Sequence, residues 1–274
     1  MGYRLEDLAD VPISYEIAKK LDTLFLGKQG ILYRQTLDST QDIAVYLAQH
    51  DEDSHGRVVI AEQQRNGRGR QRRRWLSPRG GIWLSAVLKP HMSLSRITLL
   101  PFAAALAVRD AIKKCTPLDP KLNWPNDIII SGKKVAGVLI DSSLDNEQIN
   151  YAVIGIGINV NVDSAAIASY LGNSDPITSI SDELGHNASL LGLTTRLLET
   201  LEYYYFQLER RGPNVILEKW KKESDILHRR VIVAQKDRTI QGIAEDINTD
   251  GSLFIRTDRH GSITVVADDV HLSF

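Results

Sequence analysis

The sequence predicts an α+β domain that is followed by a small β domain. Apolar, strand-like segments crowd together between residues 121 and 161, and a helical pattern of apolar residues covers residues 189–211. From about residue 226, short alternating segments separated by turns take over, which is typical of a small all-β module. With 274 residues, 43% of them hydrophobic and 24% charged, the chain can fold into one or two domains.

The near-neutral composition argues against a protein that binds nucleic acid over its whole surface, because the formal net charge is −1. Cys115 is the only cysteine, which rules out an intrachain disulfide and fits a reducing, cytoplasmic location. Its place late in an apolar helical stretch predicts a small core residue. The N-terminus is polar and acidic, unlike a signal peptide, and the longest apolar run, ITLLPFAAALAV, is too short to span a bilayer.

The first elements of the α+β domain follow a lead-in of residues 1–26, which contains a helical pattern, SYEIAKKL. The strand-like ILYRQTL then runs into Asp38-Ser39-Thr40, whose side chains are typical of a helix N-cap, so a helix is expected there. RVVIAEQQ and GIWLSAVLKP are expected strands that enter and leave an arginine-rich loop. Residues 95–115 are predicted to form a core helix.

Three apolar strands are expected next, namely KLNWPNDIIIS, KKVAGVLIDSS and INYAVIGIGINVN, with turns at Ser131-Gly132 and Asp145-Asn146. Their tight spacing favours an antiparallel meander, because parallel strands need longer crossover connections. A helix over 189–211 follows, with a buried stripe formed by Leu190, Leu197, Leu201, Tyr204 and Leu208. NVILEKWKKES indicates another helix, and RVIVAQ, RTIQGIAEDI, SLFIRT and SITVVA are the strands of the small β module.

The segment EQQRNGRGRQRRRW, from Glu62 to Trp75, concentrates six arginines, at positions 65, 68, 70, 72, 73 and 74. By charge alone it would be a solvated basic loop or a nucleic-acid patch. Gly67 and Gly69, however, allow positive φ angles and a close approach of the backbone to a ligand. Guanidinium groups beside free backbone N–H groups suit a carboxylate or phosphate, and Trp75 offers a flat face on which adenine could stack.

Two other segments carry candidate site residues. In GIGINV, Gly155 and Gly157 indicate either tight strand packing or a ligand lying flat against the strand, and both interpretations stay open. In LNWPNDIIISGKKVAG, Asn126 and Asp127 are compact polar groups at the head of an apolar strand. Lys134 would face inward only if it meets an anion, since burying an unpaired ammonium group is costly.

Five segments in one order resemble the biotin protein ligases (biotin–[carboxylase] ligases). They are DST at 38–40, Q-x-x-G-R-G-R at 64–70 with Trp75, WPND at 124–127, GKKVAG at 132–137 and GIGINVN at 155–161. Each segment is a weak signal alone, but the five together, in order across almost the whole chain from about residue 30, are highly specific.

The resemblance implies a catalytic domain at residues 27–224, in which a mixed sheet is flanked by helices as in class II aminoacyl-tRNA synthetases. A small SH3-like β-barrel would follow at residues 225–274, and residues 1–26 would be a lead-in or linker remnant. Many relatives carry an N-terminal winged helix that binds DNA, and GYRL at 2–5 resembles the end of such a domain. We therefore expect a form without the DNA-binding domain, which binds no operator.

The resemblance also implies two chemical steps. Biotin and ATP, with Mg²⁺, would give biotinyl-5′-AMP and pyrophosphate. A lysine of a biotin carboxyl carrier domain, as found in acetyl-CoA or pyruvate carboxylase, would then attack the adenylate. No membrane partner is implied, and a homodimer is expected because relatives often dimerise through sheet edges.

The resemblance assigns roles to individual residues. Arg68 and Arg70 would neutralise like charges where the carboxylate meets the polyphosphate, and Lys134 would stand at the junction of carboxylate and α-phosphate. These three are the predicted catalytic residues, whereas Arg72, Arg73 and Arg74 would only set the field or support the loop. The predicted biotin-binding residues are Ser39, Thr40, Gln41, Gln64, Gly67, Arg68, Gly69, Arg70, Lys134, Gly137, Leu139, Gly155 and Gly157. The predicted ATP or adenylate residues are Trp75, Asn126 and Asn159, and Asp127 is the candidate metal ligand.

The sequence departs from the family pattern at three positions. Asn123 replaces the lysine that usually precedes WPND, Asp141 replaces a glutamate, and Arg72 stands where a small residue is usual. These changes bear on rate and ATP affinity, so a catalytically weak protein that binds biotin or biotinyl-AMP is the second hypothesis. A nucleic-acid-binding protein and a lipoate ligase are further alternatives, although a lipoate ligase should lack the GRGR segment.

Overall fold

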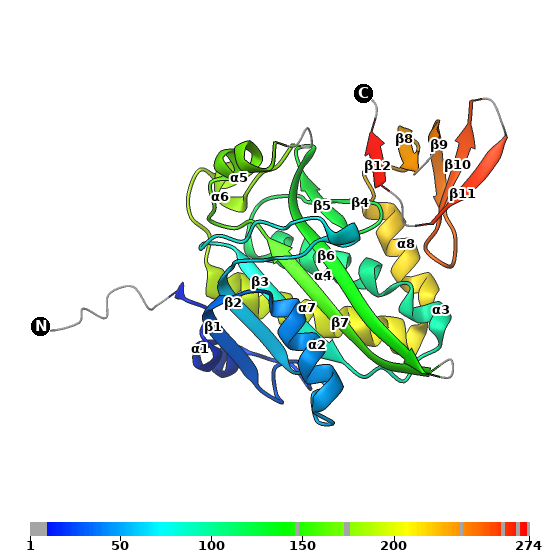
Figure 1. Cartoon of the computed structure of the whole chain (residues 1–274). Coiled ribbons are helices and arrows are strands. Elements are labelled where there is room, and N and C mark those ends of the chain that lie inside the picture. Colours follow the sequence, from blue (N-terminus) through cyan, green and yellow to red (C-terminus); the bar gives the residue numbers. More distant parts are fainter. Residues whose placement is uncertain are drawn as a thin grey trace, which may run out of the picture.

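The computed structural model describes residues 10–145, 148–172, 176–235, 238–258, 261–266 and 269–272. The GYRL segment at 2–5, and Asn146 in one of the expected turns, lie outside these residues. The larger of two sheets is built from β1 (Ile31–Leu37), β2 (Val58–Gln64), β3 (Ile82–Leu88), β4 (Lys121–Asn123), β5 (Asp127–Ile130), β6 (Lys133–Asp145) and β7 (Gln148–Ile158). Its seven strands run in the order β1-β2-β3-β7-β6-β5-β4 (Figure 1).

The large sheet is mixed, as the family resemblance implies. β1 and β2 are parallel, whereas all the other neighbouring strands are antiparallel. The expected antiparallel meander is confirmed by the order β5-β6-β7. β7 is the central strand and joins the two halves of the sheet, because it pairs with β3 on one side and with β6 on the other.

The predicted strand over KLNWPNDIIIS is wrong in one respect, because it is two strands. β4 and β5 form a hairpin in which Lys121 pairs with Ile129, and the chain turns at residues 124–126. The Trp124-Pro125 peptide bond is cis. Proline has no N–H to give to a sheet ladder, so a strand would not have run through this position unbroken. The turn leaves Asn126 and Asp127 at the head of β5.

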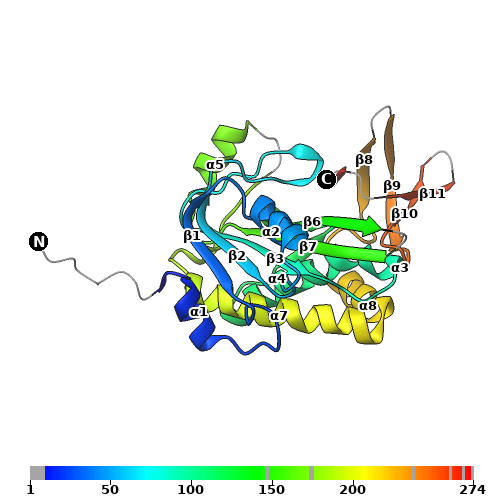
Figure 2. The same cartoon turned by 60° about the horizontal axis from the view of Figure 1, so that its bottom comes forward.

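The helices form two layers, one on each face of the large sheet (Figure 2). They are α1 (Ser14–Lys20), α2 (Thr40–His50), α3 (Leu94–Ile97), α4 (Leu100–Cys115), α5 (Ser164–Leu171), α6 (Ile180–Leu184), α7 (Leu190–Arg211) and α8 (Pro213–Glu223). α4 and α7 pack against each other and, with α1 and α8, cover one face. α2 packs on β2, β3 and β7 from the opposite face, which leaves part of that face available for a site.

Two expectations about helices need correction. The predicted helix over 95–115 is divided into α3 and α4, because Pro101 stands in the first turn of α4, where its missing N–H costs nothing. Cys115 is the last residue of α4 and is exposed, so it is not a core residue. The long helix α7 is confirmed, with Leu197, Leu201, Tyr204 and Leu208 buried and Leu190 partly buried.

The small β domain is a five-stranded antiparallel sheet, consistent with the expected SH3-like domain. Its strands are β8 (Arg230–Gln235), β9 (Arg238–Ile247), β10 (Leu253–Thr257), β11 (Ser262–Val265) and β12 (Asp269–Leu272). The turn between β9 and β10 reaches the larger domain, because the Trp124 Nε1–H donates to the Gly251 carbonyl at 2.9 Å. Within the described part of the chain, none of the helices combines the length and apolar character of a membrane span.

Candidate active site

A cavity of about 430 Å³ lies over the large sheet, between the start of α2, the arginine-rich segment, α5 and the strands β5 to β7. The predicted residues that line it are Ser39, Thr40, Gln41, Gln64, Arg68, Gly69, Arg70, Trp75, Asn126, Asp127, Lys134, Gly137, Leu139, Gly155, Gly157 and Asn159. Gly67 does not line this cavity and instead lies at an adjacent depression that includes Asp141. Segments distant in the sequence thus meet at one place.

One end of the cavity consists of neutral hydrogen-bonding groups at the start of α2. Ser39 is the N-cap, as expected, and its Oγ accepts a hydrogen bond from the backbone N–H of Asp42 at 3.4 Å. Gln64 Oε1 accepts from the backbone N–H of Thr40 at 2.7 Å. Thr40 Oγ1 lies 2.9 Å from Ser85 Oγ, and both hydroxyls are buried. This end can exchange hydrogen bonds with a neutral polar ligand.

Gln41 connects this polar end to the rim of the cavity. Its Nε2 donates to the Val153 carbonyl at 3.2 Å and to Asp141 Oδ2 at 3.3 Å, and its Oε1 accepts from Ser85 Oγ at 2.9 Å. A Cβ atom at Gly155 would lie only 2.4 Å from Gln41 Oε1. The glycine therefore makes room for the glutamine side chain, and it also lines the cavity.

The indole of Trp75 lies against the sheet over Gly137 and Gly157, which face each other in β6 and β7. A Cβ atom at Gly157 would lie 2.6 Å from the indole Nε1, and one at Gly137 would lie 3.0 Å from Cζ3. The ammonium group of Lys134 is 5.3 Å from the centre of the indole ring, within the range of a cation–π contact. The absence of side chains at Gly137 and Gly157 thus allows the Trp75 indole to pack directly on the sheet.

The arginine-rich segment folds as a hairpin over the sheet, and we call residues 65–76 the arginine hairpin. The Trp75 N–H donates to the Gly67 carbonyl at 2.9 Å, and the Gly69 N–H donates to the Arg73 carbonyl at 2.8 Å. Gly67 is required by space, because a Cβ atom there would lie 2.4 Å from the Trp75 carbonyl oxygen. Gly67 and Gly69 do not use the positive φ angles that glycine allows, and Gln71, with φ of 54°, is the hairpin residue in the left-handed conformation.

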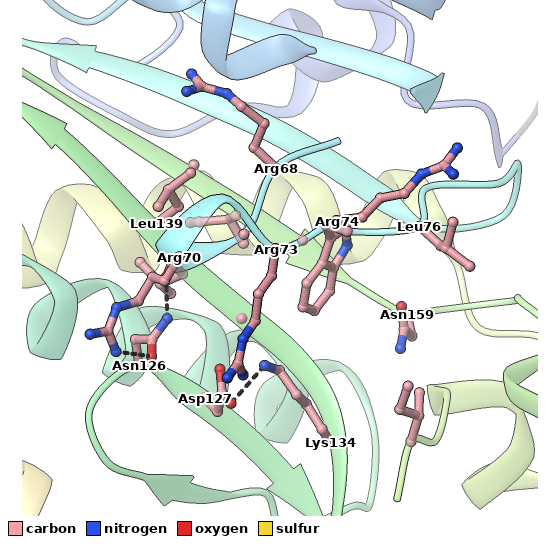
Figure 3. A pocket seen from close by; sticks show the side chains of 18 of the residues that line it. Arg68, Arg70, Arg73, Arg74, Leu76, Asn126, Asp127, Lys134, Leu139 and Asn159 are labelled. Atoms are coloured by element: carbon pink, nitrogen blue, oxygen red, sulfur yellow. Dashed lines mark hydrogen bonds and ion pairs between the residues drawn. The ribbon is translucent and has the colours of Figure 1, made fainter. Parts of the chain in front are cut away.

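Two arginines of the hairpin point into the cavity (Figure 3). Arg70 Nη1 donates to Asn126 Oδ1 at 3.1 Å. Arg73 also lines the cavity and extends toward the side where Asp127 lies. The sequence assigned Arg73 only a supporting role, and its placement adds a second guanidinium group to the cationic end of the cavity.

Two other arginines point away from the cavity centre, toward different sides of the hairpin (Figure 3). Arg68 Nη2 lies 2.6 Å from Asp42 Oδ1 and 3.2 Å from Asp141 Oδ2, so its guanidinium group is bound at the rim beside the polar end. Arg74 Nη1 donates to the hydroxyl of Tyr170 on α5 at 2.8 Å. These two side chains tie the hairpin to structures on either side of it.

Lys134 faces the cavity and forms an ion pair with Asp127, with 2.6 Å between Nζ and Oδ2. Its backbone is fixed on both sides, because its N–H donates to the Pro176 carbonyl at 2.8 Å and its carbonyl accepts from the Thr178 N–H at 2.9 Å. These bonds hold the ammonium group at a defined place beside the arginine hairpin, about one-third exposed, with 31% of the side chain accessible.

The neighbouring Lys133 lies outside the cavity, as the alternation of side chains along a strand predicts. Its Nζ lies 2.9 Å from Glu183 Oε1, which also accepts a hydrogen bond from Thr178 Oγ1 at 2.7 Å. Burial alone would raise the pKa of Glu183, but the hydrogen bonds from Lys133, Thr178 and Ser131 hold the pKa below its usual value. Glu183 therefore stays ionised and secures the segment that supports Lys134.

The predicted magnesium site depends on the acidic residues around the cavity. No group of three or more His, Cys, Asp or Glu side chains that could hold a metal ion is present among the described residues. Asp127 is the acidic residue beside Lys134, and a single carboxylate suits Mg²⁺ only where substrate phosphates and water supply the remaining oxygen ligands. The residues present fit a metal that arrives with a polyphosphate.

Several cavity residues were missed in the sequence, because most of them are apolar side chains without a motif. Leu76 of the hairpin, Ile167 and Leu171 of α5, and Ile177 form one wall and pack in a common cluster with Trp75. Ile167 and Leu171 are four residues apart, so the helical spacing was a usable signal. Ser85 is a polar residue inside the apolar strand GIWLSAVL, which was a second signal.

Comparisons with known proteins agree with this geometry. A model of the biotin/lipoate A/B protein ligase family matches residues 32–159. The bifunctional ligase/repressor BirA of Bacillus subtilis (strain 168) is 31% identical over 272 residues, which cover 99% of this chain and 82% of the relative. The biotin–[acetyl-CoA-carboxylase] ligase of Paracoccus denitrificans is 32% identical over 200 residues, which cover 72% of this chain and 83% of the relative.

A solved structure shows the same fold. The biotin protein ligase from Aquifex aeolicus in complex with biotin and ATP is 26% identical to this chain, with a TM-score of 0.74, and the likeness covers 89% of this chain and 99% of that one. The ordered motifs, the mixed sheet and the cavity agree with these matches. The chain belongs to the biotin/lipoate A/B protein ligase family and, within it, to the biotin protein ligases.

Proposed function

We propose that this chain is an ATP-dependent biotin–[biotin carboxyl carrier protein] ligase. It forms biotinyl-5′-AMP from biotin and ATP and then transfers biotin to a lysine of a carrier domain. The observation that carries this proposal is the two-ended cavity. A neutral hydrogen-bonding end at the start of α2 is joined, along one sheet, to a cationic end at Arg70, Arg73 and Lys134.

The two ends suit the two parts of a biotin–nucleotide conjugate. The ureido group of biotin is neutral and polar, and it matches the hydroxyl and amide groups of Ser39, Thr40 and Gln64. The reaction joins a carboxylate to a phosphate, and the cations must be in place before charge develops there. Lys134 and Arg70 meet this condition, because each is already held by a polar partner, Asp127 and Asn126 respectively.

The nucleotide half of the proposed site includes Trp75 and Asn159. Asn159 is buried and its Nδ2 donates to the Thr178 carbonyl at 3.1 Å, which leaves its Oδ1 to accept from a ligand amine. The indole of Trp75 already contacts Gly137 and Gly157, so an adenine would stack on the side of the ring turned away from the sheet. Mg²⁺, bound with the nucleotide, would screen the polyphosphate charge beside Asp127.

Arg68 stays a predicted catalytic residue whose role must be reconciled with its ion pairs. Its guanidinium group is bound by Asp42 and Asp141 at the rim, so it would have to leave two carboxylates to reach a phosphate. The departure from the family pattern at Asp141 is located here, since this shorter carboxylate meets both Arg68 and Gln41.

A single assay tests the proposed function. The chain is incubated with ATP, Mg²⁺, labelled biotin and a biotin carboxyl carrier domain, and label on the carrier is followed. Label that depends on ATP and on the target lysine, with a lysine-to-arginine carrier as the control, supports the ligase. Tight biotin binding without transfer favours the second candidate, a biotin-binding sensor, and transfer of labelled lipoate but not biotin would reassign the substrate.

The proposal extends to the acceptor protein, the cellular location and the oligomeric state. The carrier domain of an acetyl-CoA or pyruvate carboxylase is the acceptor we propose, because a relative is named for acetyl-CoA carboxylase. We also propose that the protein works in the cytoplasm as a homodimer and binds no operator DNA. Sedimentation at several protein concentrations tests the dimer, and retardation of a biotin-operator fragment by this chain would contradict the last point.

A further inference from the structure

The side chain that holds the nucleotide side of the arginine hairpin is Tyr170. Arg74 Nη1 donates to the Tyr170 hydroxyl at 2.8 Å, and the guanidinium carbon lies 5.4 Å from the centre of the tyrosine ring. Arg74 Nη2 also donates to the Arg65 carbonyl at 3.3 Å, so one guanidinium group joins both strands of the hairpin neck to α5. None of the five motifs described above includes Tyr170, and Tyr170 does not line the cavity.

Beneath this contact an apolar layer closes the same side of the cavity. Trp75 and Leu76 of the hairpin pack with Ile167 and Leu171 of α5, which are on the same helix as Tyr170. α5 has a firm start, because the Asp163 side chain accepts from the Ala166 N–H at 2.9 Å. The Arg74–Tyr170 contact therefore lies at the outer edge of the interface between the arginine hairpin and α5.

The opposite flank of the hairpin is tied by Arg68 to Asp42 and Asp141. With ties at both flanks, the hairpin crosses the cavity as a strap, and of the four arginines labelled in Figure 3, Arg70 and Arg73 point inward. The nucleotide-side tie is exposed, since 65% of the Tyr170 surface is accessible. An exposed contact of this kind is weak, which suits a part that must open to admit ATP and release product.

We propose that Tyr170 is a positioning residue that acts through Arg74 to keep the arginine hairpin closed on α5, and so retains the reactive adenylate until an acceptor lysine arrives. We call the Arg74–Tyr170 contact the latch. The retention of the adenylate rests on the proposed function, whereas the closure of the hairpin by the latch does not. Retention matters because a mixed anhydride that escapes into water is hydrolysed or acylates any amine it meets.

The latch is tested without any enzymatic activity by limited trypsin digestion. The hairpin is rich in trypsin sites, and cleavage inside it reports how often it opens. We expect Tyr170→Phe, which loses only the hydroxyl, to raise the initial cleavage rate within residues 65–74 by about threefold. Tyr170→Ala should raise it by about tenfold. Cleavage elsewhere in the chain is the internal reference, and Tyr15→Ala is the matched control, because Tyr15 is 68% exposed on α1 beyond the opposite face of the sheet.

The consequence is measured as leakage of biotinyl-AMP. The full chain is given biotin, ATP and Mg²⁺ without carrier, and steady pyrophosphate production and free biotinyl-AMP in a rapid filtrate are followed. Tyr170→Ala and Arg74→Ala should each raise the leak by a factor similar to that of the cleavage rate, about tenfold for Tyr170→Ala. The double variant should leak no faster than the more severe single variant, because both changes open one contact.

Each outcome decides a different point. Unchanged cleavage within 65–74 in both Tyr170 variants, or equal acceleration at every site, overturns the latch. Faster hairpin cleavage with an unchanged leak overturns retention, and additive leaks in the double variant overturn the pairing of Tyr170 with Arg74. If the unaltered chain makes no biotinyl-AMP, the proposed function fails, whereas the trypsin comparison still decides the latch.

Discussion

Lys133 and Lys134 are adjacent on β6 and have opposite surroundings. Lys133 lies outside the cavity against Glu183, whereas Lys134 faces the cavity and pairs with Asp127. The two ammonium groups are chemically identical, so their different roles come only from the side of the strand on which they lie. This makes the pair a natural test and control.

Lys134→Ala should lower the rate of biotin-dependent ATP–pyrophosphate exchange by about 10²–10³-fold, because it removes a fixed charge at the place where the transition state becomes more negative. Lys133→Ala should change the rate by less than about twofold, because Lys133 lies outside the cavity and Glu183 keeps its hydrogen bonds from Thr178 and Ser131. Near-normal exchange in Lys134→Ala would remove this residue from the mechanism, and equal losses in the two variants would point to damage of β6.

For single residues, the sequence showed which positions matter but not which side chains they contact. Gly155 and Gly157 were recognised, but the side chains over them, Gln41 and Trp75, are far away in the chain and only the fold identifies them. Cys115 was expected in the core because its stretch is apolar, yet it is the end residue of a helix and lies at the surface. Which glycine admits which neighbour is decided by contacts between distant segments.

The arginine hairpin is the element whose internal geometry the sequence described least well. Its alternation of glycine and arginine predicted a loop that closes on an anion, but not a hairpin with its own backbone hydrogen bonds. The two glycines also differ, because Gly67 is crowded by the Trp75 carbonyl whereas the nearest atom to a Cβ at Gly69 is 3.5 Å away.

This difference gives a prediction for two variants of the same kind. Gly67→Ala should weaken biotin binding by about tenfold, because a clash with a backbone oxygen opens the hairpin neck at a cost typical of overpacking. Gly69→Ala should stay within about twofold of the unaltered protein, since its methyl group has room. Isothermal titration with biotin measures both constants, and equal affinities for the two variants would contradict the crowding seen at Gly67.

Among the secondary-structure elements, the long and periodic ones were predictable and the interrupted ones were not. The helix over 190–211 and the meander of β5, β6 and β7 follow from periodicity and spacing. The divisions at Pro101 and at Trp124-Pro125 were missed, although a proline stands at each. A proline inside an apolar run is a stronger signal than the run itself, because it cannot complete a helix or sheet hydrogen bond.

In the whole molecule, Trp124 connects the small β domain to the larger one. It is 2% exposed, and its indole N–H donates to the Gly251 carbonyl in the turn between β9 and β10. Trp220 is equally buried, but its indole nitrogen has no hydrogen-bond partner. The two tryptophans therefore differ in one buried hydrogen bond.

Trp124→Phe should lower the free energy of unfolding by about 1–2 kcal/mol more than Trp220→Phe does, because it leaves the Gly251 carbonyl without a partner inside the protein. Both variants lose similar packing volume, so the difference isolates the hydrogen bond. Urea denaturation followed by circular dichroism measures both values, and equal losses would show that the bond between the domains contributes no net stability.

The whole site could be anticipated from the sequence only through the order of five motifs. Physical patterns identified the arginine-rich segment and Lys134 as candidates, but nothing in composition or periodicity indicates that they lie together. The apolar wall formed by Leu76, Ile167, Leu171 and Ile177 was missed for the same reason, since its members look like ordinary core residues until the fold exposes them to a cavity.

The place of β7 has a consequence for synthesis on the ribosome. β7 is the last strand of the large sheet to be made, yet it lies between β3 and β6 and is the only strand that joins the two halves of that sheet. A nascent chain that stops before residue 148 can pair β1 with β2 and β3, and β4 with β5 and β6, but each group keeps an open edge. The cavity therefore forms late in synthesis, because β7 joins the two groups of strands and α5, which supplies part of the apolar wall, is made after β7.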